Sequence, residues 1–301
     1  MASSPPLPPP CPDVTYHCPF PLCGDFVINN NMRYRCFSKA DKLSFRKLAD
    51  DLSDFHLRYE KEGCFVWDRK IKGEDIHMVK MFGTLENVTP SLLYDVLHDP
   101  HYRSVWDEAK KEGYRIALLN ASNDIGYYGA RISGPVSDRS FLNQRTWIDV
   151  GGGEYVICNS SVPHNNLPAD KEKDYVRAIS KISGYLVRPW GDTGCSLTYI
   201  TLSDPGGWIP STVINYLTTK LAPNTLTNLR KACAGYPTWL AQQKVHTPAW
   251  RVPVPDPWEV PQPNAVHDFV RQRLGLGAAA PPMSPGPIGV TPGRNDEGAP
   301  K

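Results

Sequence analysis

Apolar residues recur along the chain with two different periods, and the changes between them outline the fold. Short runs of alternating or continuous apolar character, separated by turn-forming residues, are typical of strands. Such runs lie at about 55–58, 64–70, 75–86, 114–119, 124–132, 139–148, 154–162, 176–187 and 195–203. Because short turns join these runs, we predict an antiparallel sheet of eight or nine strands.

Three segments have the 3.6-residue period of amphipathic helices instead. The first follows Asp41, a candidate N-cap. Its apolar stripe consists of Leu43, Phe45, Leu48 and Leu52. The second covers 90–98, and the third runs from about 210 to 234, where Pro223 predicts a kink or hinge. The pattern therefore predicts an α+β fold, with a sheet of about nine strands curved around a long C-terminal helix.

Proline divides the chain into three parts. The 30 prolines concentrate near both ends, and the central region has the density of an ordinary folded domain. We predict a Pro-rich disordered tail over 1–37, one folded domain over 38–244 and a Pro-rich, largely disordered tail over 245–301. A short helical stripe interrupts the second tail at Val266, Phe269, Val270 and Leu274. This segment either docks on a partner or bilayer, or frays because it is under three turns long.

Composition limits the classes of partner and site. A net charge of +2 from 33 basic and 31 acidic residues provides no large single-sign field, so nucleic-acid binding is not expected. The sequence contains no apolar run of membrane-spanning length and no signal-peptide or lipidation pattern. We therefore expect a cytoplasmic protein whose membrane contacts are peripheral and reversible. The eight cysteines indicate reduced thiols and lack zinc-site spacing, so neither a metal nor another cofactor is expected.

Five short motifs occur in a fixed order across about residues 40–240. The most specific one spans Leu92 to Asp107, where a helical pattern leads into Tyr-Arg-x-x-Trp-Asp. The others are Asp124-Ile-Gly-Tyr-Tyr128, Pro135-Val-Ser-Asp-Arg-Ser-Phe141, Arg177-Ala-Ile-Ser with Gly184-Tyr-Leu, and Asp204-Pro-Gly-Gly-Trp-Ile-Pro210. This set resembles the START lipid-transfer family. The likeness is strongest to the phosphatidylcholine-transfer-protein-like subgroup, especially its member with extended tails that also transfers phosphatidylethanolamine.

The resemblance implies a helix-grip fold that holds one phospholipid in an internal tunnel between the curved sheet and the C-terminal helix. It implies a monomeric carrier that takes the lipid from one membrane and delivers it to another. The alternative is a lipid-sensing module that signals through protein partners of its Pro-rich tails without net transfer. The chain has no phosphate loop, nucleophile elbow or histidine metal spacing, so we expect no enzymatic activity.

A buried phosphodiester must be paired with positive charge, and the planar fork of a guanidinium can bind two of its oxygens. The resemblance assigns this role to Arg103, the arginine of the Tyr-Arg-x-x-Trp-Asp motif. The alternative is that Arg103 pairs with Asp99 or Asp107 and fixes the end of the helix.

The resemblance also gives a lining for the headgroup and tunnel. The expected residues are Leu97, Tyr128, Phe141, Lys181, Ser183, Tyr199 and Thr201. Tyr128 and Phe141 stand at aromatic cage positions of the choline-binding relative, whereas Lys181 and Thr201 replace aromatic residues there. An inward Lys181 would disfavour choline or ethanolamine; the alternative is a side chain whose ammonium reaches water. Strict strand alternation would place Lys181 and Ser183 on one face.

Lipid entry requires a gate. The loop 163–173 fits the family's omega-type loop, although it is also compatible with a solvated connection. Trp208, Lys220 and Pro223 are the expected gate and membrane-contact residues, with core packing as the alternative for Trp208.

Overall fold

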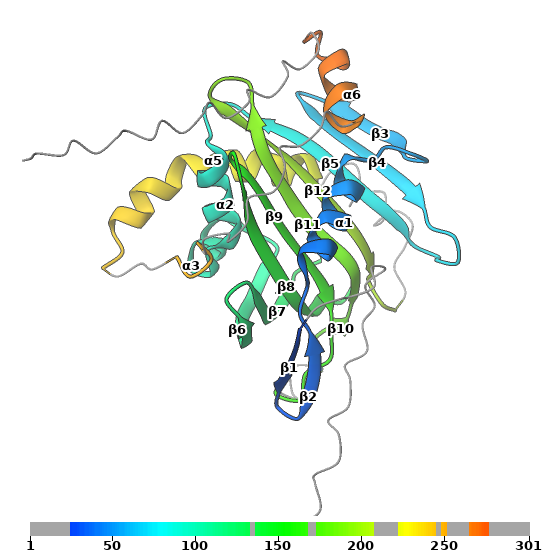
Figure 1. The fold of residues 1–301 in the computed structure, drawn as a ribbon, viewed down its shortest axis with the longest axis vertical. Coiled ribbons are helices and arrows are strands. Elements are labelled where there is room, and N and C mark those ends of the chain that lie inside the picture. Colours follow the sequence, from blue (N-terminus) through cyan, green and yellow to red (C-terminus); the bar gives the residue numbers. More distant parts are fainter. Residues whose placement is uncertain are drawn as a thin grey trace, which may run out of the picture.

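One large, curved antiparallel sheet forms the centre of the molecule (Figure 1). The computed structural model describes residues 25–132, 136–167, 173–207, 222–244, 248–251 and 265–276. In spatial order, the strands are β3 (His56–Lys61), β4 (Cys64–Lys70), β5 (His77–Leu85), β12 (Gly194–Asp204), β11 (Ile179–Trp190), β9 (Glu154–Ser161), β8 (Arg139–Gly151), β7 (Asn123–Ala130) and β6 (Lys110–Asn120). A short β10 (Val176–Arg177) pairs in parallel with β8. The predicted α+β fold with its antiparallel sheet is confirmed.

Helices pack against both faces of this sheet. We call inner the face against which α2 (Pro90–His98), α3 (Pro100–Trp106) and α5 (Ala222–Ala241) pack. The outer face carries α1 (Lys39–Asp50) and α6 (Ala265–Arg273). Alternation divides each strand between the two faces, so that on β4 Val66 points inward and Trp67 outward.

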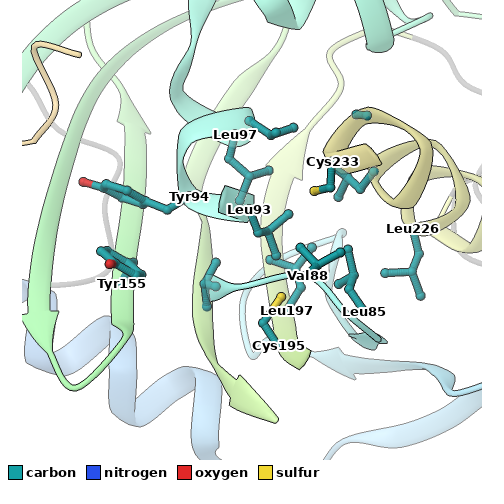
Figure 2. Close-up of a cluster of buried hydrophobic side chains, with 14 of the residues drawn as sticks. Leu85, Val88, Leu93, Tyr94, Leu97, Tyr155, Cys195, Leu197, Leu226 and Cys233 are labelled. Atoms are coloured by element: carbon teal, nitrogen blue, oxygen red, sulfur yellow. The ribbon is translucent and has the colours of Figure 1, made fainter. Parts of the chain in front are cut away.

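The apolar part of the inner face joins the helices to the sheet. Figure 2 shows Leu93 and Leu97 of α2 turned toward Leu226 and Cys233 of α5, with Leu197 of β12 nearby. The approach of α5 to β5 is so close that a Cβ on Gly83 would lie 2.4 Å from a methyl carbon of Leu226. A glycine at this position therefore allows α5 to lie directly on the sheet.

Two helix boundaries differ from the predicted ones. Ser38, not Asp41, is the N-cap of α1; Asp41 is the third helical residue, and its carboxylate accepts a hydrogen bond from the backbone N–H of Ser38. The two residues form a capping box. At the other end of the chain, α5 continues seven residues past 234 and contains Pro237. Packing holds the helix together there, since Tyr236 is buried and its hydroxyl donates to Asp99.

The range 1–37, predicted as a tail, contains a folded hairpin. Strands β1 (Phe26–Asn29) and β2 (Met32–Arg35) pair antiparallel across a turn at Asn30 and Asn31, which both have positive φ. Asparagine tolerates this backbone region, and the two-residue turn matches the twist of a hairpin. The boundary at 37 is therefore corrected: the first folded element of the described residues begins at Phe26.

The described parts of the segment after 244 also pack on the domain. The predicted helical stripe forms α6, which places Val266, Phe269 and Val270 against aromatic residues of the outer face. Trp250 is buried, stacks on His98 of α2 with ring centroids 5.7 Å apart, and donates to Asp95. Neither predicted alternative for the stripe applies, because its apolar face binds the sheet of its own chain.

Candidate functional site

The candidate site begins at α3, a seven-residue helix that the sequence pattern had not separated from its neighbours. Asp99 is its N-cap and accepts hydrogen bonds from the backbone N–H groups of His101 and Tyr102. Arg103 lies in the last turn, and its Nε donates to Oδ2 of Asp107, one helical turn later, at 2.8 Å. The helix therefore fixes both members of an ion pair at one place on the inner face.

Aromatic rings surround this ion pair. The guanidinium carbon of Arg103 lies 5.4 Å from the ring centroid of Trp106 and 5.3 Å from that of Tyr128 on β7. The hydroxyl of Tyr128 donates to the same Asp107 oxygen at 2.9 Å. Phe141 of β8 lies beside Tyr128, with centroids 6.5 Å apart. Three of the predicted residues, Arg103, Tyr128 and Phe141, are thus brought together.

The guanidinium of Arg103 is only partly used. Among the described residues, Asp107 alone accepts a hydrogen bond from it, and the Nη1 and Nη2 groups have no partner there. A quarter of the side-chain surface remains accessible. Burial favours the neutral form, but Tyr185 and Asp107 outweigh it and raise the pKa of Arg103, so the group stays charged. A charged donor fork with unused N–H groups can bind an anion.

Tyrosines and hydroxyl groups extend the site along β11 and β12. Tyr185 and Tyr199 stack with ring centroids 5.0 Å apart. Burial raises the pKa of Tyr199, so its hydroxyl stays neutral. Next to them lies a chain of four hydroxyls, in which each lies 2.7 to 2.9 Å from the next; in order they belong to Ser180, Ser183, Thr201 and Ser203. Three further predicted residues, Ser183, Tyr199 and Thr201, therefore form a second, mostly neutral part of the site.

Lys181 does not follow the alternation predicted for its strand. The pairing register of β11 shifts between Ser180 and Ile182, so Lys181 sits in a β-bulge. Its Nζ lies 2.5 Å from a carboxylate oxygen of Glu74. The loop that carries Glu74 also packs Ile76 against the cluster beneath α1 on the outer face. Strict alternation is therefore interrupted at Lys181, and its ammonium pairs with this loop.

The remaining predicted lining residue, Leu97, is 2% exposed and lies in the apolar cluster between α2 and α5 (Figure 2). Two of the predicted gate residues, Trp208 and Lys220, fall outside the described residues. Pro223 lies in the first turn of α5, and its side chain is outside the description as well.

The predicted gate loop 163–173 is described up to residue 167. This part is held by the β1–β2 hairpin: the hydroxyl of Tyr34 donates to the carbonyl of Pro163, and the Oδ1 of Asn29 lies 3.0 Å from Nε2 of His164. The described half of the loop is therefore bound to the domain by the hairpin.

The predicted site residues did not include three residues that the structure brings to the site: Trp106, Asp107 and Tyr185. The pairing of Arg103 with Asp107 is one of the two pairings given as the alternative for Arg103, and the spacing of four residues on a helix favours it. Alternation places Tyr185 on the strand face of Ser183, but the predicted lining did not include it.

No helix among the described residues is both long and apolar enough to cross a membrane. The same residues contain no group of three or more His, Cys, Asp or Glu side chains placed to hold a metal ion.

The chain is similar to known proteins of one family. Residues 61–238 match the START domain. START domain-containing protein 10 of Mus musculus is 35% identical over 218 residues, which are 72% of this chain and 74% of that protein. Phosphatidylcholine transfer protein of Rattus norvegicus is 29% identical over 188 residues, which are 61% of this chain and 86% of that protein. The crystal structure of human STARD10 matches with a TM-score of 0.67 and 34% identity, over 72% of this chain and 88% of that chain. The chain therefore belongs to the START domain family, in its phosphatidylcholine-transfer-protein-like subgroup.

Proposed function

We propose that this protein binds one phospholipid against the inner face of its sheet and transfers it between membranes without catalysing a reaction. The observation that carries the proposal is Arg103, a charged guanidinium inside the fold with two nitrogens unpaired among the described residues. A phosphodiester is the part of a phospholipid that most needs such a partner, because burying an unpaired anion is costly. Family membership supports lipid binding in general, and one relative is named for phosphatidylcholine transfer.

The side chains near Arg103 suggest how the rest of the headgroup is held. The faces of Tyr128 and Phe141, and the stacked pair Tyr185 and Tyr199, are partly accessible. Aromatic faces attract a quaternary ammonium by about 0.5 to 2 kcal/mol each. The positive charge of Lys181 is paired with the carboxylate of Glu74. We therefore omit Lys181 from the headgroup site and propose that a cationic headgroup is tolerated.

The first test is the lipid content of the purified protein. Native mass spectrometry should find one phospholipid per wild-type chain. In Arg103→Ala, the loaded fraction should fall at least tenfold, because the phosphate loses its charged partner. Arg103→Lys keeps the charge but loses the planar fork, so its loading should be intermediate. Arg58→Ala is the matched control, since Arg58 is half exposed and pairs with Asp68 on the same hairpin. Normal loading of Arg103→Ala would contradict the phosphate role.

A second assay separates carrier from sensor. Movement of labelled phospholipid from donor to acceptor vesicles should proceed with many turnovers per wild-type chain, and Arg103→Ala should slow it in proportion to its loss of loading. Stoichiometric binding without movement would instead support a lipid-sensing module.

A further inference from the structure

The β1–β2 hairpin precedes residues 61–238, which match the START domain, and one of its faces is exposed. Phe26 pairs with Arg35 and Ile28 pairs with Arg33, so alternation places these four side chains on a single face. Phe26 is 37% exposed and Ile28 is 67% exposed, the latter the highest value among the large apolar residues described. The hairpin thus presents two apolar and two cationic side chains together.

The opposite face of the hairpin is firmly packed. Tyr34 is fully buried, and Val27 and Met32 lie against the same cluster, which includes Leu142 of β8. The hairpin is therefore a rigid platform, and its exposed face cannot turn inward without breaking this cluster.

The exposed face combines positive charge with apolar surface in direct contact. The guanidinium carbon of Arg33 lies 3.5 Å from the ring centroid of Phe26, and that of Arg35 lies 4.9 Å from it. Residues 25–35 contain two arginines and one acidic residue, the exposed Asp25, so their formal charge is positive. Cations beside apolar side chains suit the interface of an anionic membrane, where the charges meet headgroups and the apolar groups enter the acyl boundary.

The position of the hairpin links this face to the sheet. In Figure 1 the hairpin projects from the end of the sheet near β10, away from α6. It contacts the segment after β9 through Tyr34 to Pro163, Asn29 to His164, and the Nδ2 of Asn165, which donates to the carbonyl of Asn30. Contact of the hairpin with a bilayer would therefore bring residues 163–165 close to the same surface.

We propose that the face formed by Phe26, Ile28, Arg33 and Arg35 is a docking surface for anionic membranes. The inference rests on the proposed lipid-carrier function, since a carrier must contact the bilayers that it serves. A second copy of the chain is the competing occupant, and the experiment below distinguishes it.

The test is flotation of the full-length protein with vesicles of phosphatidylcholine alone or mixed with phosphatidylserine. Wild-type protein should bind the mixed vesicles more strongly. The double variant Arg33→Gln, Arg35→Gln should reduce the partition coefficient on mixed vesicles about 30-fold, because each arginine contributes about fivefold near an anionic surface. Ile28→Ser should reduce binding to both kinds of vesicle about tenfold, because an apolar anchor acts independently of lipid charge.

Matched controls exclude a general effect of surface substitution. Leu118→Ser removes a residue of β6 that is 56% exposed, and Arg58→Gln removes a half-exposed cation of β3; both should bind like wild type. Unchanged melting temperatures should show that the hairpin variants are folded. Equal vesicle binding by the hairpin variants and wild type, or equal loss in the controls, would overturn the proposal.

Two further measurements, of oligomeric state and of lipid content, distinguish membrane docking from self-association and from the carrier function. A change of oligomeric state in the hairpin variants, with unaltered vesicle binding, would assign the face to a second copy of the chain and overturn membrane docking. Lipid content, measured by native mass spectrometry, tests the carrier function independently. Hairpin-dependent vesicle binding by a protein without bound phospholipid would support the docking surface and count against the carrier.

Discussion

The two faces of the sheet each hold an arginine within the fold, and the two arginines differ in how many of their nitrogens are paired. On the outer face, Arg188 is 5% exposed, and its guanidinium donates to both Asp50 and Glu154. On the inner face, Arg103 is 25% exposed and has one carboxylate partner, Asp107. Both arginines carry a full charge within the fold, but only Arg103 retains unpaired donors among the described residues.

This difference distinguishes a structural ion pair from a binding site. Removing charges from water is compensated when each donor finds an acceptor, as at Arg188. At Arg103 the cost of removing the charge from water is only partly offset, because two of its nitrogens have no acceptor among the described residues. Partly accessible aromatic rings and hydroxyls lie beside it. The inner face therefore forgoes some stability, which a ligand with an anionic group would restore. If the charged and apolar contacts of the outer face serve stability, substitutions there should lower the free energy of unfolding more than matched substitutions elsewhere.

The largest effect is expected for Arg188→Met. The substitution leaves Asp50 and Glu154 without their shared partner, although Arg46 still donates to Glu154. The free energy of unfolding should fall by about 3 to 5 kcal/mol, measured by urea denaturation. Arg58→Met, which breaks a half-exposed pair, should cost under about 1 kcal/mol. A loss of similar size in both variants would mean that Arg188 does not differ from a surface residue.

The sequence predicted the fold well because the fold depends on local patterns. Alternation and turn residues located the strands of the main sheet, and Glu62 with Gly63, both at positive φ, form the turn of a predicted hairpin. Proline density was less informative. It assigned the β1–β2 hairpin and α6 to tails, although these elements are stabilised by contacts with residues far away in sequence, such as Leu142 and Phe82.

The site was predictable where it depends on a motif and unpredictable where it depends on register. The spacing within Tyr-Arg-x-x-Trp-Asp placed Arg103 on a helix beside Asp107. The position of Lys181 depends on a bulge, and a single inserted residue reverses the faces that alternation assigns. Nothing in the local sequence specifies that Glu74, over a hundred residues away, is the partner of Lys181.

A pair of glycines compares the space beneath α1 on the outer face with the space beside Tyr128 on the inner face, away from the close contact of Gly83 with α5. A Cβ on Gly184, on the outer face, would lie 2.3 Å from the carbonyl oxygen of Ile157 and 2.7 Å from the ring of Phe45. A Cβ on Gly126, on the strand face of Tyr128, would meet only the carbonyl oxygen of Tyr114 at 3.6 Å. Gly184→Ala should therefore lower the free energy of unfolding by about 2 to 3 kcal/mol. Gly126→Ala should change it by less than about 0.5 kcal/mol in the same denaturation experiment. Equal costs would mean that the backbone at Gly184 is no more crowded than the backbone at Gly126.

The smallest effect concerns pH and a second cation of the outer face. Lys80 is fully buried; its Nζ donates to the backbone carbonyls of Leu48 and Asp51 at the end of α1. Burial lowers the pKa of Lys80 from 10.5 to about 7, although the Asp51 carboxylate opposes the shift. The folded protein therefore releases this proton above pH 7, whereas the unfolded chain keeps it up to about pH 10.

Stability should accordingly rise with pH in this window, because the unfolded state binds more protons than the native state. Between pH 7 and 8.5 the contribution is about 1.5 kcal/mol, and Lys80→Met should abolish it. Burial raises the pKa of the inner-face hydroxyls of Tyr128 and Tyr199, so they do not titrate in this range. Lys70→Met, at an exposed position of β4, should retain the wild-type slope. Urea denaturation at several pH values measures all three proteins, and subtracting the variant from the wild type cancels the titration of the cysteines. An identical slope in wild type and Lys80→Met would show that the ammonium of Lys80 is not desolvated.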